Sequence, residues 1–178
     1  MRELARTFSR TLVPLSFLAA CQLGGGGGTG ASAGTTYDFT ATLEQTVNVV
    51  IVPTYADMRA RAIALRVAAE ALAASPTDVN LATARAAWVA ARVSWEQSEG
   101  FLYGPVSELG LDPALDSWPV DRVQLDQVLE SGLALSAESI TANFGGGLRG
   151  FHTVEYLLWG ADHVKTAEGL AARPRELE

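Results

Sequence analysis

The sequence contains a single cysteine, Cys21, so no disulfide can form within the chain. It contains only two histidines, His152 and His163, which leaves few nitrogen ligands for a metal ion. The lack of a set of thiolates argues against a structural zinc site. No segment sustains the alternation of apolar and polar residues that marks a half-buried strand, and the mature chain is therefore predicted to be all-α.

Long apolar runs are also lacking. The stretch "TLVPLSFLAA" at residues 11–20 is shorter than the roughly 20 residues that span a bilayer. Because it follows a positively charged stretch, residues 1–21 are predicted to be an export signal. Residues 18–21 resemble a bacterial lipobox, which predicts a lipid on Cys21, and an ordinary secretory signal is the alternative. Residues 22–36 are rich in glycine and serine and are predicted to form a flexible tether.

Basic residues are scarce, at 13 against 20 acidic ones, and the net charge is −7. Without residues 1–20, which hold three arginines and one glutamate, ten basic and nineteen acidic residues remain, for a net charge of about −9. This charge argues against a nucleic-acid partner. It suits a domain that attracts cations, and equally a secreted domain that needs only to be soluble.

Apolar residues recur at three- and four-residue intervals along most of the remaining chain, which is the period of a buried helical face. Pro53 predicts a kink or a fresh start in the first helix, and Ser75 is placed to cap the second, followed by Pro76. Residues 104–121 lack such a period and are predicted to be a long ordered loop. The expected helices span residues 38–74, 75–101, 120–132, 136–144 and 148–159.

Polar candidates for a site lie on the second helix and in the loop. Arg92, Glu96 and Glu99 share one helical face, because they are separated by four and then three positions. They form either a solvated ladder of ion pairs or a carboxylate pair that faces inward, and the spacing leaves both interpretations open. The loop residues best placed to shape a site are Asp116, Trp118, Pro119 and Asp121.

The stretch "GFHTVEYLLWG" at residues 150–160 places His152 one helical turn before Glu155 within an apolar run. An imidazole nitrogen and a carboxylate oxygen at this spacing can bind one metal ion, as Glu-x-x-His pairs do in carboxylate-bridged bundles. The alternative is a buried polar pair that only makes hydrogen bonds. His163 lies in a polar stretch and is predicted to be solvated.

Four segments occur in an order that resembles the N-terminal half of the imelysin family: "IVPTY", "AAWVAARVSWEQSEGFLYGP", "LDSWPVD" and "GFHTVEYLLWG". The family signature, Gly-x-His-x-x-Glu, is matched by Gly150, His152 and Glu155, and the resemblance covers about residues 38–162. It implies an up-and-down helical bundle in a protein of the bacterial cell envelope, often a lipoprotein. Some members are described as metallopeptidases, and many look like iron-regulated proteins of metal uptake.

The resemblance and the residues together predict a metal site formed by His152, Glu155 and Glu99, with Glu96, Asp116 and Trp118 as weaker candidates. Iron suits such nitrogen and oxygen ligands, and zinc is an alternative. Three functions stay open: metal binding for uptake or storage, metal-dependent peptide hydrolysis with Glu155 as general base, and a helical domain in which the pair is structural. The expected location is the periplasm or the cell surface, with a lipid anchor in the outer membrane.

One departure from the family concerns the C-terminal part of the sequence. Family chains continue beyond the "EYLLWG" segment with another long helix and a second helical domain, whereas residues 163–178 are predicted to be a polar tail. The domain at residues 37–162 therefore resembles a truncated member. An exposed apolar face is expected on the helix at 148–159, where a partner protein would cover it.

Overall fold

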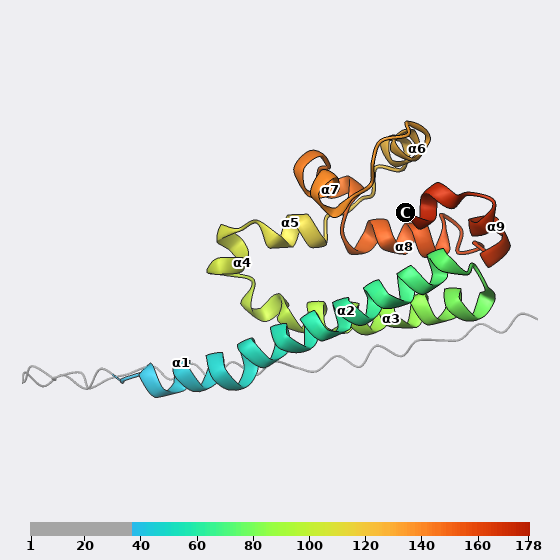
Figure 1. Cartoon of the computed structure of the whole chain (residues 1–178). Helices are drawn as coiled ribbons and strands as arrows, with labels where there is room; N and C mark the ends of the chain where they lie inside the picture. The colour runs from blue at the N-terminus through green and yellow to red at the C-terminus, as the bar shows by residue number, and fades with distance from the viewer. Residues whose placement is uncertain (1–36) are drawn as a thin grey trace, which may run out of the picture. The chain divides into compact units, whose positions relative to one another are not determined.

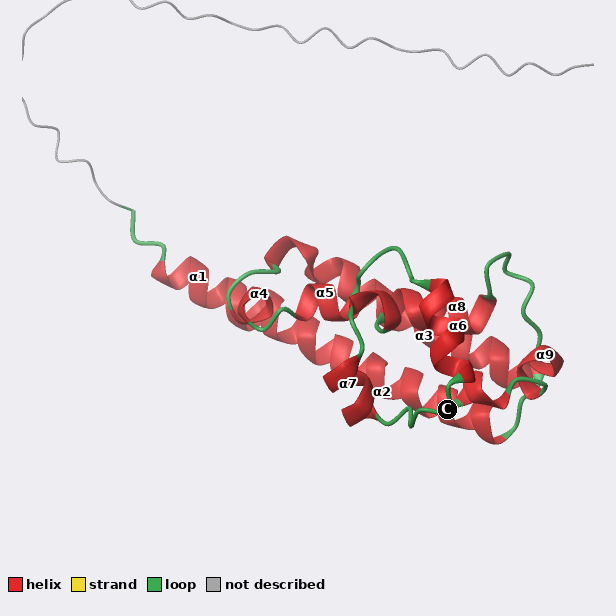
Figure 2. Cartoon of the chain, turned by 90° about the horizontal axis from the view of Figure 1, so that it is seen from above, coloured by secondary structure: helices red, strands yellow, loops and turns green. Residues whose placement is uncertain are grey.

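The computed structural model describes residues 37–178, and every regular element in that range is helical (Figure 2). The predicted signal peptide, the lipid site at Cys21 and the tether lie outside the described residues. None of the helices within residues 37–178 has both the length and the hydropathy that a membrane crossing requires. The α-helices are α1 (Thr40–Thr46), α2 (Val52–Ala74), α3 (Asp78–Ser98), α4 (Pro105–Glu108), α5 (Leu111–Leu115), α6 (Arg122–Glu130), α7 (Ala137–Asn143), α8 (Phe151–Trp159) and α9 (Ala167–Ala171).

Helices α1 and α2 form one continuous rod (Figure 1), because a π-helical turn at Val47–Ile51 joins them. The backbone N–H of Val52 donates to the carbonyl of Val47, five residues back. Pro53 follows just after this turn, so the place where the continuous helix lacks one N–H donor coincides with the change from the π turn to α2. The interruption predicted at Pro53 therefore takes the form of a wider turn, and the helix runs on.

Helices α2 and α3 pack against each other as a hairpin (Figure 1). The predicted cap at Ser75 is wrong, because Thr77 caps α3: its hydroxyl accepts a hydrogen bond from the Asn80 N–H at 3.2 Å. Proline at 76 holds the preceding residue in an extended conformation, so Ser75 ends α2 and the new helix begins later. A 3₁₀ turn at Glu99–Phe101 extends α3 to the predicted end.

The loop predicted over 104–121 contains two short helices, α4 and α5. Gly104 and Gly110, both with φ of +60°, precede these helices and let the chain turn sharply before each one. Each helix is close to a single turn, too short to produce a periodic pattern in the sequence. Residues 116–121 remain irregular, as predicted.

Helix α8 is the central element of the core, and Figure 1 shows it between the α2–α3 pair and α6. Its residue Leu158 belongs to a buried cluster with α2, α3 and α9, and Phe151 packs with Ala91 and Trp95 of α3. Leu148, just before the helix, packs with α6. Because all three clusters meet at α8, the side chains at its N-terminus are held from several sides.

The predicted helix at 148–159 begins later than expected, at Phe151, because Gly150 has a φ of +91°. The exposed apolar face predicted for it is wrong: every side chain of α8 is buried or half-buried. The prediction of a polar tail at residues 163–178 is also wrong. This segment folds back over the core, where Ala167 and Leu170 of α9 are buried against α2 and α3.

Candidate metal centre

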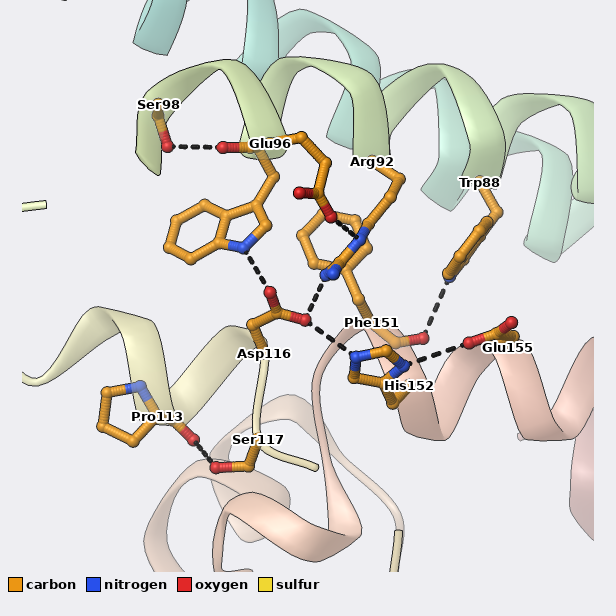
Figure 3. A network of polar contacts seen from close by, with 11 residues as sticks. Trp88, Arg92, Glu96, Ser98, Pro113, Asp116, Ser117, Phe151, His152 and Glu155 are labelled. Atoms are coloured by element: carbon orange, nitrogen blue, oxygen red, sulfur yellow. Dashed lines mark hydrogen bonds and ion pairs between the residues drawn. The ribbon is translucent and has the colours of Figure 1, made fainter. Parts of the chain in front are cut away.

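His152 lies in the first turn of α8, with its ring between two carboxylates (Figure 3). Its Nε2 atom is 3.1 Å from Oδ1 of Asp116, and its Nδ1 atom is 3.1 Å from Oε2 of Glu155. The ring of Trp118 packs edge-on against the imidazole, with 4.8 Å between the ring centroids. The side chain of His152 is 19% exposed, so one edge of the ring reaches the surface.

Asp116 ends helix α5 and is held by donors from α3. Its Oδ2 atom accepts a hydrogen bond from the Trp95 indole N–H at 2.8 Å, and its Oδ1 atom accepts one from the guanidinium of Arg92. Nε2 of His152 lies at ion-pair distance from this carboxylate, whereas the hydrogen bond of the imidazole is the one between Nδ1 and Glu155. Asp116 thereby helps to orient the imidazole ring.

The other ring nitrogen, Nδ1 of His152, faces the carboxylate of Glu155. In the tautomer with its proton on Nε2, the lone pair of Nδ1 faces the carboxylate oxygen, and a proton or a metal ion between the two atoms makes this contact favourable. A proton on Nδ1 gives an ordinary hydrogen bond at 3.1 Å. A metal ion fits the same pair, because ligands at about 2.0 to 2.2 Å that bind at a right angle are about 3 Å apart.

Glu99 does not join His152 and Glu155. Its carboxylate converges instead with those of Glu96 and Asp116, and one ligand oxygen from each lies within 4.8 Å of the others. The side chains of Glu96 and Glu99 are exposed. Arg92 pairs with Glu96 at 2.6 Å and also contacts Asp116. The interpretation as a solvated ladder of ion pairs therefore fits Glu96 and Glu99, and of the three residues only Arg92 turns inward, toward Asp116.

A small open pocket lies on the Glu155 side of the imidazole, lined by Trp118, Arg122, His152, Glu155, Tyr156 and His163. The prediction of a solvated His163 holds for its exposure, but the residue also borders this pocket. Gly160 ends α8 with a φ of +77°, and His163 itself has a φ of +56°, so the chain reverses there. Gly160 was the sequence signal that the second imidazole would return toward the first.

A sequence model of the imelysin family, peptidase family M75, matches residues 51–176. The chain belongs to the imelysin family. It is 34% identical over 148 residues to iron-regulated protein A of Synechococcus elongatus, and the match covers 74% of this chain and 39% of that protein. The predicted family membership and the all-α bundle are thus confirmed.

Two crystal structures of this family are similar to the chain. An iron-regulated protein A precursor from Parabacteroides distasonis has a TM-score of 0.69 and 34% identity, covering 82% of this chain and 41% of that one. An imelysin peptidase from Bacteroides ovatus has a TM-score of 0.56 and 40% identity, covering 65% of this chain and 34% of that one. The chain therefore spans about two fifths of the length of these relatives.

Proposed function

We propose that this imelysin-family chain binds a metal ion, iron foremost, between Nδ1 of His152 and the carboxylate of Glu155. The observation that carries the proposal is the position of the imidazole, with Nε2 3.1 Å from Asp116 and Nδ1 3.1 Å from Glu155. Histidines that bind metals characteristically donate their other N–H to a carboxylate, which orients the ring and makes it a better ligand. Arg92 and Trp95 hold that carboxylate in place.

The chemistry of the donors suits both iron and zinc, and the similarity to named relatives favours iron. One imidazole and carboxylate oxygens suit Fe(II), Fe(III) and Zn(II), whereas the only thiol of the chain, Cys21, lies far away in sequence. Similarity to two proteins named iron-regulated protein A supports iron. His163 on the same pocket is a further imidazole that can complete the ligand set. The exposed carboxylates of Glu96 and Glu99 attract cations toward this end of α3 without belonging to the same site.

The biological role that follows is capture of the ion for uptake or storage at the bacterial cell envelope. A lipid on Cys21 and the tether at 22–36 would hold the domain at the outer membrane, in the periplasm or at the cell surface. Peptidase activity is the competing function, supported by the similarity to the imelysin peptidase of Bacteroides ovatus. In that case Glu155 would act as general base on a water bound to the ion.

Equilibrium metal binding tests the proposal. The chain, His152→Ala, Glu155→Gln and Glu130→Gln are titrated with Fe(II), Fe(III), Zn(II) and Cu(II), and far-UV circular dichroism checks that each variant is folded. Glu130 is an exposed carboxylate at the end of α6, away from the pocket, and serves as the matched control. We expect about one ion to bind and its binding to be lost in the first two variants only.

The outcomes separate the three functions. Folded protein that takes up no ion, with a His152→Ala variant that is merely less stable, would make the pair structural. Cleavage of an unfolded protein substrate that requires the metal and disappears in Glu155→Gln would establish the peptidase. A His163→Ala variant with weakened but saturable binding would identify the third ligand.

A further inference from the structure

Helix α1 and the π turn after it present apolar side chains but bury none of them. The exposed large members of this set are Leu43, Val47, Val49 and Val50, and Val52 at the start of α2 is exposed as well. Helix α3, the partner of α2, ends at Ser98, and the chain then turns away through Gly104. The N-terminal part of the rod therefore has an apolar surface that no other described element covers, which is unusual for a monomeric domain.

A groove of about 530 Å³ runs along this surface. One wall consists of Val47, Ile51 and Tyr55, and the other wall includes Phe101, Val106 and Leu111. The π turn contributes to the shape of the first wall. Four residues are more than one turn of an α-helix, so side chains four apart are rotated slightly around the axis. Four residues are less than one turn of a π-helix, so the rotation there has the opposite sense. The two rotations offset each other, and Val47, Ile51 and Tyr55 lie along one line.

The groove is almost entirely apolar, and its polar side-chain atoms are the hydroxyls of Tyr55 and Tyr103. The Tyr55 hydroxyl is shielded from solvent and has no hydrogen-bond partner among the described residues. Its ring packs edge-on against Phe101 at 5.5 Å, which joins the two walls. A bound partner would cover the apolar surface of the groove and give this hydroxyl a hydrogen-bond partner.

The charge of the segments that form the groove indicates which kind of partner would bind there. Residues 37–58 and 93–121, which supply both walls, contain nine acidic residues and no basic ones. The remaining described residues contain ten of each, so the whole net charge of the domain belongs to these two segments. Four exposed carboxylates, those of Glu44, Glu99, Glu108 and Asp112, lie within three residues of the lining side chains.

We propose that this groove is a docking site for an amphipathic helix of a partner protein, with an apolar stripe flanked by lysine or arginine. A ridge of side chains at four-residue intervals receives the stripe of a helix, which is the helix-in-groove mode of recognition. The carboxylates then meet the basic flank. A second copy that docked through its own groove and an anionic membrane would both bring negative charge to this groove and be repelled.

Fluorescence anisotropy with three synthetic peptides of roughly 18 residues, about five helical turns, tests the proposal on the full chain. One peptide has a leucine stripe with lysines, one has the same stripe with glutamates, and one has the lysines with a scrambled stripe. The variants are Val47→Lys in the groove and Val67→Lys on α2 as the matched control. Both valines are exposed, at 43% and 53%, so neither substitution removes a buried side chain.

We expect saturable binding of the leucine–lysine peptide alone, weakened at least about tenfold by Val47→Lys and unchanged by Val67→Lys. Binding should also weaken as salt is added. Equal binding of the glutamate peptide, an equal loss in both variants, or no binding at all would overturn the proposal. Self-association of the chain in sedimentation equilibrium would also overturn the proposal if Val47→Lys abolished it, because a second copy would then occupy the groove. Sedimentation of the chain with lipid vesicles would overturn it in the same way if Val47→Lys abolished that sedimentation, because a membrane would then occupy the groove.

Discussion

The glycine of the Gly-x-His-x-x-Glu motif sets the geometry of the site, and replacing it should disrupt both the fold and the candidate metal centre. A Cβ atom on Gly150 would lie 2.4 Å from the carbonyl oxygen of Leu115 and 2.7 Å from its carbonyl carbon. Cβ atoms essentially never come closer than 3.0 Å to another heavy atom, so the two backbones would have to separate by at least about 0.6 Å. Gly150 also has φ of +91° and ψ of −168°, a region that only glycine adopts readily.

The expected cost of Gly150→Ala follows from these two effects. A residue forced into that backbone region costs about 1 to 3 kcal/mol, and overpacking against fixed backbone costs about 1 to 3 kcal/mol more. We therefore expect the free energy of unfolding to fall by about 3 kcal/mol or more, a large part of the roughly 5 to 15 kcal/mol typical of a domain. Because Leu115 directly precedes Asp116, the separation also moves Asp116 away from His152, and metal binding should weaken.

Urea denaturation followed by tryptophan fluorescence measures the loss, with Gly147→Ala as the control. A Cβ atom on Gly147 would meet its nearest neighbours at 3.6 Å, which is ordinary contact, and its φ is not positive. The midpoint should therefore shift in Gly150→Ala and hardly change in Gly147→Ala, with similar slopes in both. Equal stability of the two variants would refute the close approach of α8 to α5.

Three further predictions concern other contacts. Asp116→Asn should lower the free energy of unfolding by about 2 to 3 kcal/mol in urea denaturation, because Arg92 loses a charged partner. The same variant should also weaken metal binding. Unchanged values of both quantities would contradict the contacts of Asp116 with Arg92 and His152. The Ser94 hydroxyl holds the pKa of Asp57 below its ordinary value, so the resulting stabilisation is present above the pKa of the unfolded state and is lost as the pH falls through the folded pKa. Thermal unfolding of Ser94→Ala and the parent chain should consequently differ more at pH 6 than below pH 3, and a constant difference would refute the linkage. Labelled palmitate should enter the chain in a bacterial host and be absent from Cys21→Ser; label in both would place the lipid elsewhere.

The sequence predicted the long helices from their apolar period, although α1 buries no side chain and α2 buries only Ala68 and Leu72. The second helix, over 75–101, was predicted from its apolar period, and the structure ends it at Phe101. The same reasoning failed for α4, α5 and α9, which are close to one turn in length. Helices this short are stabilised by tertiary contacts, such as that of Leu170 with the α2–α3 pair, and no local pattern reveals those contacts.

The same limit explains the difference at the candidate site. Helical spacing predicted the pair of His152 and Glu155 correctly as neighbours, because both lie on one helix. Spacing carried no information about the third residue, and Glu99 was preferred to Asp116 as the companion of the pair. The structure brings Asp116 to His152 because α5 ends there and Trp95 and Arg92 hold the carboxylate.

Each residue of the Gly-x-His-x-x-Glu motif has its own role in the geometry of the site. Gly150 allows the start of α8 to touch the backbone at Leu115, and this contact brings the following residue, Asp116, beside His152. The interval from His152 to Glu155 is one helical turn, so the second ring nitrogen meets a carboxylate from its own helix. Each change to the motif therefore has a distinct signature. Loss of the glycine should affect stability and the proposed binding together, whereas loss of Glu155, a half-buried side chain whose hydrogen-bond partner among the described residues is His152, should affect mainly the proposed binding.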